Sequence, residues 1–519
     1  MAQRHSLLIV FGLMLLGCSS AIAQAQDWPS RGRDRSHNPV VPDKDLRLKV
    51  EVDDRGHFSN LKWSADIGMG LYSEPAIADG LIWIGGSNAT PRDPEFKGDA
   101  GVLFCFRESD GEFLYQYVSP RRKEGRNFDW PIYGIASTPY IEGGHLYFCT
   151  NRCETVCLNI QPLIDKTGLP KEVWKVDMVE EFGVLPGAAH IGSRHQHCSP
   201  VVWNDLLFVN TTHTVRPWLL EQLPKRKSPA PSLICFDKKT GKVKWSDNTP
   251  GNSSIGQQWN NPTIIRAGGT DQVVMGQGDG WVRSFDCSNG NLIWKFDINE
   301  KSARLKFGSG WIDSKVLRMV LAEPVFKNER LFFAAGFETE SCQITGRLCC
   351  VDPSKKGDIS SELLSGATEI TPNPDSGLIW EFKGSPSGER GYDADAKNPN
   401  TMHGTLGSVA IHEGFVVVTD VNGSVHCLDE DSGKRHWSFD TMSRIYGSPL
   451  ILGNQISVTN EDGVVYSIPL SKELDRENLQ ETWGSYIFSS SPVFANGRVY
   501  MTTYKNILAF ECESESTRE

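Results

Sequence analysis

The stretch that decides the fold is Asp237-Lys-Lys-Thr-Gly241-Lys-Val-Lys-Trp245. Its pattern, Asp-x-x-x-Gly followed by Trp, recurs with the same spacing from Asp286 to Trp294 and from Asp429 to Trp437. An apolar strand precedes each copy, and the glycine stands where a tight turn reverses the chain. Each copy therefore predicts the end of one strand, a turn, and a second strand that carries an aromatic side chain.

Each copy belongs to a longer repeat, which opens with a small or polar residue and usually a proline. The eight openings are Glu74-Pro75, Thr138-Pro139, Ser199-Pro200, Asn261-Pro262, Glu323-Pro324, Ser408-Val409, Ser448-Pro449 and Ser491-Pro492. An apolar strand, a hairpin turn such as Asp79-Gly80 and a second strand follow each opening. A four-stranded antiparallel sheet cannot stand alone, and radial stacking buries both of its faces. We therefore predict an all-β protein, an eight-bladed β-propeller of four-stranded antiparallel blades.

The aromatic residue of each fourth strand is predicted to pack flat between neighbouring blades, as a tryptophan docking motif. The candidate docking residues are Trp63, Trp174, Trp245, Trp294, Trp380, Trp437 and Trp483. The eighth unit, from Pro492 to Phe510, contains only three strands. We predict that the N-terminal strand around Trp63 completes this last blade and closes the ring, which leaves no exposed sheet edge.

The first 26 residues read as an export signal. Leu7–Leu16 is an apolar run that is too short to span a bilayer, and Ala-Ile-Ala23 suits cleavage after Ala23. Alternatively, Leu-Leu-Gly-Cys18 resembles a bacterial lipobox, which would anchor the chain through a lipid on Cys18. We expect a signal peptide over 1–23, a leader over 24–60, a propeller over 61–512 and a polar tail over 513–519. The protein is then exported to the periplasm or cell envelope, or secreted.

Composition narrows the class of partner. The 519 residues include 53 Lys and Arg against 64 Asp and Glu, a formal net charge of −11. This acidic balance, without a basic run, argues against nucleic acid as a partner. No stretch after the signal is long and apolar enough to form a transmembrane span.

The repeat resembles a known family once its residues are set out together. Leu-x-Cys-x-Asp-x-x-x-Gly-Lys-x-x-Trp is similar to the PQQ repeat, which builds the quinoprotein alcohol dehydrogenases and the BamB-like propellers. Asp27-Trp-Pro-Ser-Arg31-Gly32 resembles the leader of exported bacterial propellers of that kind. The resemblance implies the fold, but it does not choose between catalysis and binding, because one fold hosts many functions.

Polar loops that enter the first strands are predicted to meet at one mouth of the central channel. In the quinoprotein dehydrogenases Ca²⁺ polarises the quinone, an Asp acts as base and a Trp supports the cofactor. The resemblance therefore implies PQQ with calcium near Glu74, Asn261 and Glu323, with Asp129 as the base and Trp259 below the cofactor. The alternative is a channel in which these polar strand ends hydrogen-bond locally.

Histidines and cysteines give two further candidates. His195 and His197 would share one face of an extended segment, and with His403 they could bind a transition metal; the alternative is a polar rim. The adjacent pair Cys349-Cys350 falls in a predicted third strand, not at the channel mouth, which departs from the dehydrogenase pattern. Cys350 then takes a small buried slot of the repeat.

Two functions remain open on the sequence. The first is a BamB-like binding or assembly scaffold, which holds an envelope protein partner through the channel mouth and the insertion loops and needs no cofactor. The alternative is a PQQ- and calcium-dependent dehydrogenase of alcohols or sugars. The largest insertions are Thr211–Pro231, Pro353–Gly377 and Lys383–Gly407, and the second of these reads as a solvated loop.

Overall fold

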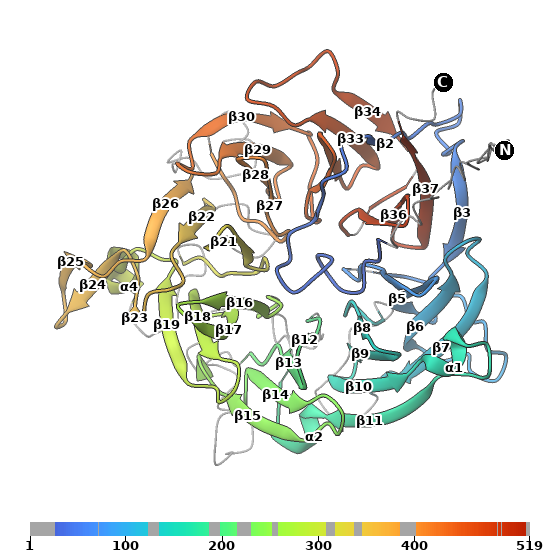
Figure 1. The fold of residues 1–519 in the computed structure, drawn as a ribbon, viewed down its shortest axis with the longest axis horizontal. Coiled ribbons are helices and arrows are strands. Elements are labelled where there is room, and N and C mark those ends of the chain that lie inside the picture. Colours follow the sequence, from blue (N-terminus) through green and yellow to red (C-terminus); the bar gives the residue numbers. More distant parts are fainter. Residues whose placement is uncertain are drawn as a thin grey trace, which may run out of the picture.

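Eight small antiparallel sheets surround a central axis in the computed structural model, with their first strands innermost and their fourth strands at the rim (Figure 1). The structure describes residues 26–70, 72–122, 134–185, 198–214, 230–251, 258–307, 317–336, 345–384, 401–484, 486–488 and 490–514. The predicted all-β, eight-bladed propeller is confirmed. We number the blades from one to eight in chain order, starting at the first opening.

The strands of the eight blades follow the order of the sequence. Blade one consists of β4(Ala76–Ala78), β5(Leu81–Ser87), β6(Ala100–Arg107) and β7(Phe113–Pro120), and blade two of β8(Tyr140–Glu142), β9(His145–Cys149), β10(Glu154–Asn159) and β11(Lys171–Asp177). Blade three consists of β12(Val201–Trp203), β13(Leu206–Asn210), β14(Leu233–Asp237) and β15(Val243–Asp247), and blade four of β16(Thr263–Ala267), β17(Thr270–Gly276), β18(Trp281–Asp286) and β19(Leu292–Asp297). Blade five consists of β20(Val325–Lys327), β21(Arg330–Ala335), β22(Arg347–Val351) and β26(Leu378–Lys383), and blade six of β27(Ala410–His412), β28(Phe415–Thr419), β29(Ser424–Asp429) and β30(Arg435–Asp440). Blade seven consists of β31(Leu450–Leu452), β32(Gln455–Thr459), β33(Val464–Pro469) and β34(Gln480–Trp483), and blade eight of β35(Val493–Ala495), β36(Arg498–Thr502), β37(Asn506–Ser514) and β3(Leu61–Asp66).

The eighth blade draws its outer strand from the other end of the chain. β3 runs antiparallel to β37, with Trp63 opposite Ala509 and Asp66 opposite Asn506. A further N-terminal strand, β2(Leu46–Leu48), pairs with the far end of β37. The N-terminal strands β2 and β3 and the C-terminal strand β37 therefore share one sheet (Figure 1).

Hairpin turns between first and second strands use the backbone conformations that their residues favour. Asp79 and Gly80 have φ of 54° and 72°, and Asn496 and Gly497 have φ of 49° and 82°. Two consecutive positive φ values are typical of the type I′ turn, whose twist matches that of the flanking strands.

Most docking tryptophans join one blade to the next in the same way. Trp174 stacks on Gly241 of the following blade, where an added Cβ would lie 2.8 Å from the ring, and its indole N–H donates to the Lys238 carbonyl at 2.9 Å. Trp63 stacks in this way on Gly111 of blade one. The N-terminal strand β3 therefore joins blade eight to blade one as the fourth strands of other blades join their neighbours. Trp245, Trp380 and Trp437 make the equivalent indole-to-carbonyl bonds at 2.8 to 3.0 Å.

Two docking tryptophans depart from this pattern. Trp294 is fully buried, but its indole donates to Gln272, because the next blade replaces the short turn with an insertion; Gln272 in turn bonds the Pro353 carbonyl of that insertion. Trp483 is 59% exposed, which contradicts its predicted docking role. The physical reason is that blade eight takes its fourth strand from the N-terminus, so it has no Asp-x-x-x-Gly turn for an indole to cover.

The repeat-slot cysteines lie opposite the docking aromatics. Cys235 pairs with Trp245, Cys350 with Trp380 and Cys427 with Trp437 in the strand registers, and these thiols are fully buried. Burial raises the pKa of each of these thiols to about 12. Cys235, Cys350 and Cys427 are free thiols, so they serve as packing groups.

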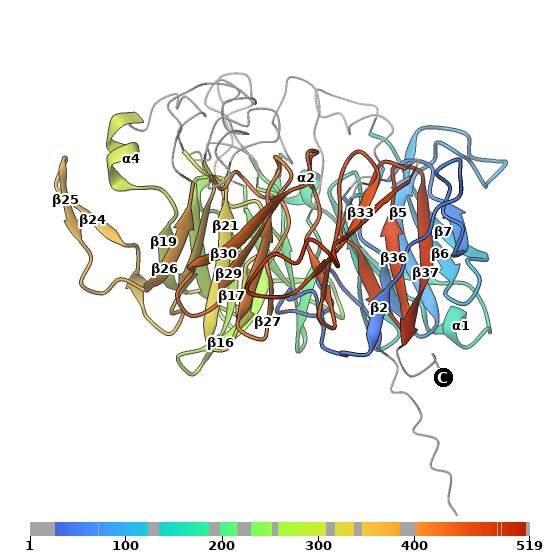
Figure 2. The same ribbon diagram turned by 90° about the horizontal axis from the view of Figure 1, so that it is seen from above.

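Insertions decorate this ring. Helices α1(Gln161–Ile164), α2(Met178–Phe182) and α4(Lys301–Phe307) are short, and none of the described helices is long and apolar enough to cross a membrane. The insertion after Pro353 is not the solvated loop that its composition predicts. It forms β23(Gly357–Asp358), which pairs in parallel with β19, and a hairpin of β24(Glu362–Ser365) and β25(Glu369–Pro372) that projects from the ring (Figure 2). Most of the other two large insertions lies outside the described residues.

Candidate functional site

A closed ring of hydrogen bonds joins the eight strand openings around the axis. In each blade the residue that precedes the opening proline forms a hydrogen bond with the corresponding residue of the next blade. Blade six has Val409 in place of the proline, so its ring residue is the one before Val409. The links run Glu74–Thr138–Ser199–Asn261–Glu323–Ser408–Ser448–Ser491 and back to Glu74. In five of them a backbone N–H donates to the next side chain, at 2.5 to 2.9 Å. The short polar side chains of the repeat thus satisfy backbone donors that the sheets leave unpaired.

The two carboxylates of this ring accept bonds from side chains. Glu323 accepts from the Asn261 amide and from the Ser408 hydroxyl, the latter at 2.6 Å. Glu74 accepts from the Ser491 hydroxyl, also at 2.6 Å. Both glutamate side chains are only 3% exposed. Two carboxylates buried at this depth require a cation or protons to remain in place.

Arg31 supplies that cation from the N-terminal leader. Its Nε donates to Glu323 at 2.8 Å, its Nη1 donates to the Tyr72 carbonyl at 2.9 Å, and its Nη2 lies 3.5 Å from Glu74. The two glutamates belong to blades one and five, which face each other across the axis, so one guanidinium bridges the channel. Burial alone would lower the pKa of Arg31, but Glu323 and Glu74 raise it above its ordinary value. Burial likewise opposes the ionisation of Glu323, yet Arg31 holds its pKa below the ordinary value.

The leader holds Arg31 there by following the inner edges of the first strands. Trp28 pairs with Ile77 of blade one, and the Pro29 carbonyl accepts from Ile141 of blade two. The Arg35 and Ser36 carbonyls accept from blades four and five, and Asn38 exchanges two bonds with Ile411 of blade six. β1(Val40–Val41) then adds in parallel to β31 of blade seven.

A sharp turn in the leader explains its glycine. Gly32 has a φ of 65°, and an added Cβ would lie 2.7 Å from the Cα of His37. Any side chain at Gly32 would therefore force the turn apart. The glycine that follows Arg31 in the leader motif is what lets the chain fold back inside the ring.

The residues proposed for a quinone site do come together. Glu74, Asn261 and Glu323 lie in the ring of openings, and the Trp259 indole lies 6.4 Å from the Tyr72 ring, between centroids. Asp129 lies outside the described residues. The cavity beside Arg31, lined by Tyr72, Trp259 and Tyr446 among others, has a volume of about 40 Å³.

Within the part of the chain that the structure describes, this arrangement does not fit PQQ with calcium. A cavity of about 40 Å³ holds a few water molecules, whereas sites for organic cofactors measure roughly 300–1,000 Å³. The oxygens that calcium would need already accept from Arg31, Asn261, Ser408 and Ser491. The predicted alternative, strand ends that hydrogen-bond locally, describes these contacts, with a guanidinium at their centre.

Only one of the three histidine candidates, His403, lies within the described residues. His195 and His197 lie outside the described residues. His403 bonds through Nδ1 to Asp420 at 3.1 Å, and Asp420 also accepts from the His426 Nε2 at 3.2 Å. Burial opposes the charge on Asp420, but its bonds to the two histidines lower its pKa well below the ordinary value. Among the described residues no three His, Cys, Asp or Glu side chains are grouped to hold a metal ion.

Sequence reasoning missed three residues of this interior. Arg31 was visible as part of the leader motif, but its partners are 41 and 292 residues away in the chain. Asp420 and His426 had a local signal, because the β28–β29 hairpin brings the turn residue and the strand residue together.

Comparisons with known proteins agree with the fold. A family model described as outer membrane protein assembly factor BamB matches residues 165–358 and 372–486, more than half of the chain. No curated protein matches the sequence. BamB from Moraxella catarrhalis is similar in structure, with a TM-score of 0.52 and 13% identity over 90% of this chain and 99% of that one. Quinohemoprotein alcohol dehydrogenase from Comamonas testosteroni is also similar, with a TM-score of 0.57 and 12% identity over 94% of this chain and 80% of that one. At such identities the two structures establish the fold alone.

Proposed function

The chain belongs to the family of the outer membrane protein assembly factor BamB, and from that premise we propose that it is a binding scaffold of the cell envelope. Export follows from the signal peptide expected over residues 1–23, with a lipid on Cys18 as the alternative mode of retention. The partner is an envelope protein, and the protein needs no cofactor to bind it.

The single observation that carries this proposal is the use of Arg31. In a quinone-dependent dehydrogenase the channel carboxylates serve the cofactor, whereas here Glu74 and Glu323 neutralise a guanidinium of the chain itself. The ring is then a rigid frame, because its polar side chains bond to one another and to Arg31 and so hold the eight blades in register. Function on such a frame falls to the loops and insertions at its surface.

One insertion has the features of a contact element. The β24–β25 hairpin projects from the ring and carries Leu364, which is 41% exposed (Figure 2). A two-stranded hairpin is marginally stable by itself, so binding a partner would stabilise it. Its base closes where the Asn373 N–H donates to the Ser361 carbonyl at 3.1 Å, so residues 362–372 can be replaced by a short Gly linker.

Two experiments test the proposal. The first titrates the purified protein with PQQ and Ca²⁺ by calorimetry and measures dye reduction with alcohols and sugars; we expect neither binding nor turnover. Stoichiometric binding and turnover that Glu323→Ala or Asn261→Ala abolishes would establish the dehydrogenase instead, provided that both variants keep the wild-type circular dichroism.

The second experiment captures partners from a cross-linked envelope fraction. We expect one or more envelope proteins to be retained by the wild type and lost when residues 362–372 are replaced or the Thr211–Pro231 insertion is shortened. A capture pattern that both trimmed variants share with the wild type would remove the insertions as the binding surface.

A further inference from the structure

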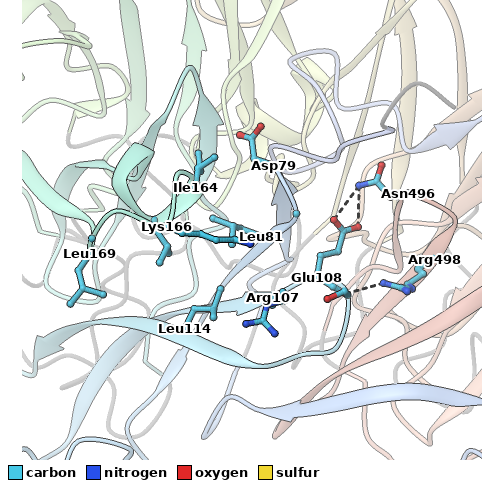
Figure 3. Close-up of a pocket in the computed structure, with 14 residues that line it drawn as sticks. Asp79, Leu81, Arg107, Glu108, Leu114, Ile164, Lys166, Leu169, Asn496 and Arg498 are labelled. Atoms are coloured by element: carbon cyan, nitrogen blue, oxygen red, sulfur yellow. Dashed lines mark hydrogen bonds between the residues drawn. The ribbon is translucent and has the colours of Figure 1, made fainter. Parts of the chain in front are cut away.

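A groove of about 850 Å³ opens where blades eight, one and two meet (Figure 3). It lies at the turns between strands, away from the ring around Arg31. No residue of that interior ring lines it. Its volume falls within the roughly 300–1,000 Å³ that is typical of binding sites.

One wall of the groove is an insertion of blade two. Blades three, four and six join their third and fourth strands by the short Asp-x-x-x-Gly turn, and blade one joins them by the equally short turn from Arg107 to Gly111. Blade two replaces this turn with residues 160–170, which hold α1 and form one wall. Lys166 sits in this wall with a φ of 57°, and Leu169 stands at the rim with 60% of its surface exposed.

One end of the groove is aliphatic. Leu81 is 6% exposed and forms the floor, while Leu114, Leu163 and Ile164 are partly buried and pack against the core of blades one and two. Figure 3 shows Ile164 and Leu169 on the blade-two side of this surface. A further aliphatic group placed here would cover Leu169 and continue the core outward.

The other end presents polar groups that are held in place. Asn496 donates to the Glu108 carboxylate at 3.0 Å, Tyr500 donates to it at 3.3 Å, and Arg498 donates to the Glu108 carbonyl at 2.9 Å. Figure 3 shows Asn496 and Arg498 beside Glu108 on the blade-eight side, across the groove from Leu169. The Asn496 side chain accepts from the Gln26 N–H at 2.7 Å and donates to Asp27 at 3.2 Å, so it serves to hold the Glu108 carboxylate in place. The Arg498 guanidinium supplies donors to a ligand, and the Glu108 carboxylate supplies an acceptor.

Charges around the groove nearly cancel, which bears on the kind of ligand. Arg107, Lys166 and Arg498 line the groove together with Asp79 and Glu108, and Arg107 is already paired with Asp110 at 2.9 Å. A balanced rim offers little attraction to a small ion. It suits a ligand that is neutral and has both donors and acceptors beside an aliphatic part, which describes a peptide segment.

We propose that this groove binds an extended peptide segment of a partner protein. One large aliphatic side chain of the peptide lies between Leu81, Leu114 and Ile164, and a neighbouring backbone amide meets the polar end at Arg498 and Glu108. This inference rests on the proposed scaffold function. It adds the groove to the insertions as a second surface that contacts a partner. The groove is small beside a whole protein interface, so we expect weak binding, with a Kd of about 0.1–1 mM.

Methyl NMR of the full exported chain, labelled at Leu, Ile and Val methyl groups, tests this directly. The probe is the capped peptide Ac-Ser-Leu-Val-Leu-Ser-NH2, and Ac-Ser-Ser-Asn-Ser-Ser-NH2 is its polar control. We expect the first peptide to shift the methyl signals of Leu81, Leu114 and Ile164 in a saturable manner, and the second to shift none. Leu169→Asp should weaken binding about tenfold, the equivalent of losing one buried aliphatic contact.

Leu292→Asp is the matched control, because Leu292 is 51% exposed on the outer strand of blade four and lies outside the groove. It should leave the peptide affinity unchanged. Absence of methyl shifts at about 5 mM peptide would overturn the proposal, as would equal effects of the two aspartate variants. Decanoate is the third probe; shifts with decanoate and not with the peptide would assign the groove to a small amphiphile. If the groove fails while envelope partners are still captured through the insertions, the scaffold function stands and only this contact surface is lost.

Discussion

Replacing Arg31 by Met removes the cation that lies between the two buried glutamates, Glu74 and Glu323. The variant leaves Glu74 and Glu323, each 3% exposed, without the guanidinium that bonds Glu323 at 2.8 Å. Removing one partner of a buried ion pair costs about 3–5 kcal/mol, because the remaining charge stays uncompensated. Unfolding entropy of about 2.1 cal/mol/K per residue gives roughly 1 kcal/mol/K for a chain of this length. The melting temperature should therefore fall by about 3–5 °C.

Differential scanning calorimetry of the protein at pH 7.5 measures this effect, with Arg35→Met as the control, because Arg35 is an exposed residue of the same leader. The double variant Arg31→Met, Glu323→Gln should lose less than the sum of the two single variants, by about 1–3 kcal/mol, since it no longer buries an unpaired charge at Glu323. An Arg31→Met protein that melts within 1 °C of the wild type would refute the reasoning, and strictly additive single variants would count against the pairing with Glu323.

The remaining predictions concern the seams between blades and the interior acid. Gly241→Ala should destabilise more than Gly143→Ala, by about 1–3 kcal/mol in urea unfolding, because both glycines have positive φ but only the first touches an indole; equal losses would mean that backbone strain alone acts. Trp380→Ala should cost about 3–5 kcal/mol and Trp483→Ala less than about 0.5 kcal/mol, since the first is 7% and the second 59% exposed; similar melting temperatures would argue against the docking scheme. The pKa of Asp420 is lowered in the folded protein, so its ionised form stabilises the fold above the ordinary pKa of 3.8, and this stability is lost as the pH falls below that value. Asp420→Asn should therefore show a flatter decline in melting temperature between pH 4 and pH 2.5, and an unchanged profile would exclude this role.

Repetition made the blades predictable from the sequence. The Asp-x-x-x-Gly turn and the hairpin turns act locally, so they specify the strands around Trp245 or Trp437 without reference to the rest of the chain. The two exceptions among the docking residues depend on what the next blade offers. Trp294 meets an insertion and Trp483 meets a blade without the turn, and neither fact is contained in the residues around the indole itself.

The interior site was predictable only in part. Polar residues at the strand openings pointed to the channel, and Glu74, Asn261 and Glu323 indeed meet there. What the residues do there depends on Arg31, which is 292 residues from Glu323 and reaches it only once the leader has entered the ring. A ligand set and an internal ion-pair network use the same residue types, so the choice between them required the position of the leader.

The Arg31 guanidinium occupies the axis of the propeller, between Glu74 and Glu323. An experimental structure of the protein, determined in the presence of PQQ and Ca²⁺, tests this arrangement most directly. We predict the Arg31 side chain in density between Glu74 and Glu323, with the ring of openings closed. Arg31 displaced from the axis, with a metal ion bound to Glu323 and Asn261, would contradict the account.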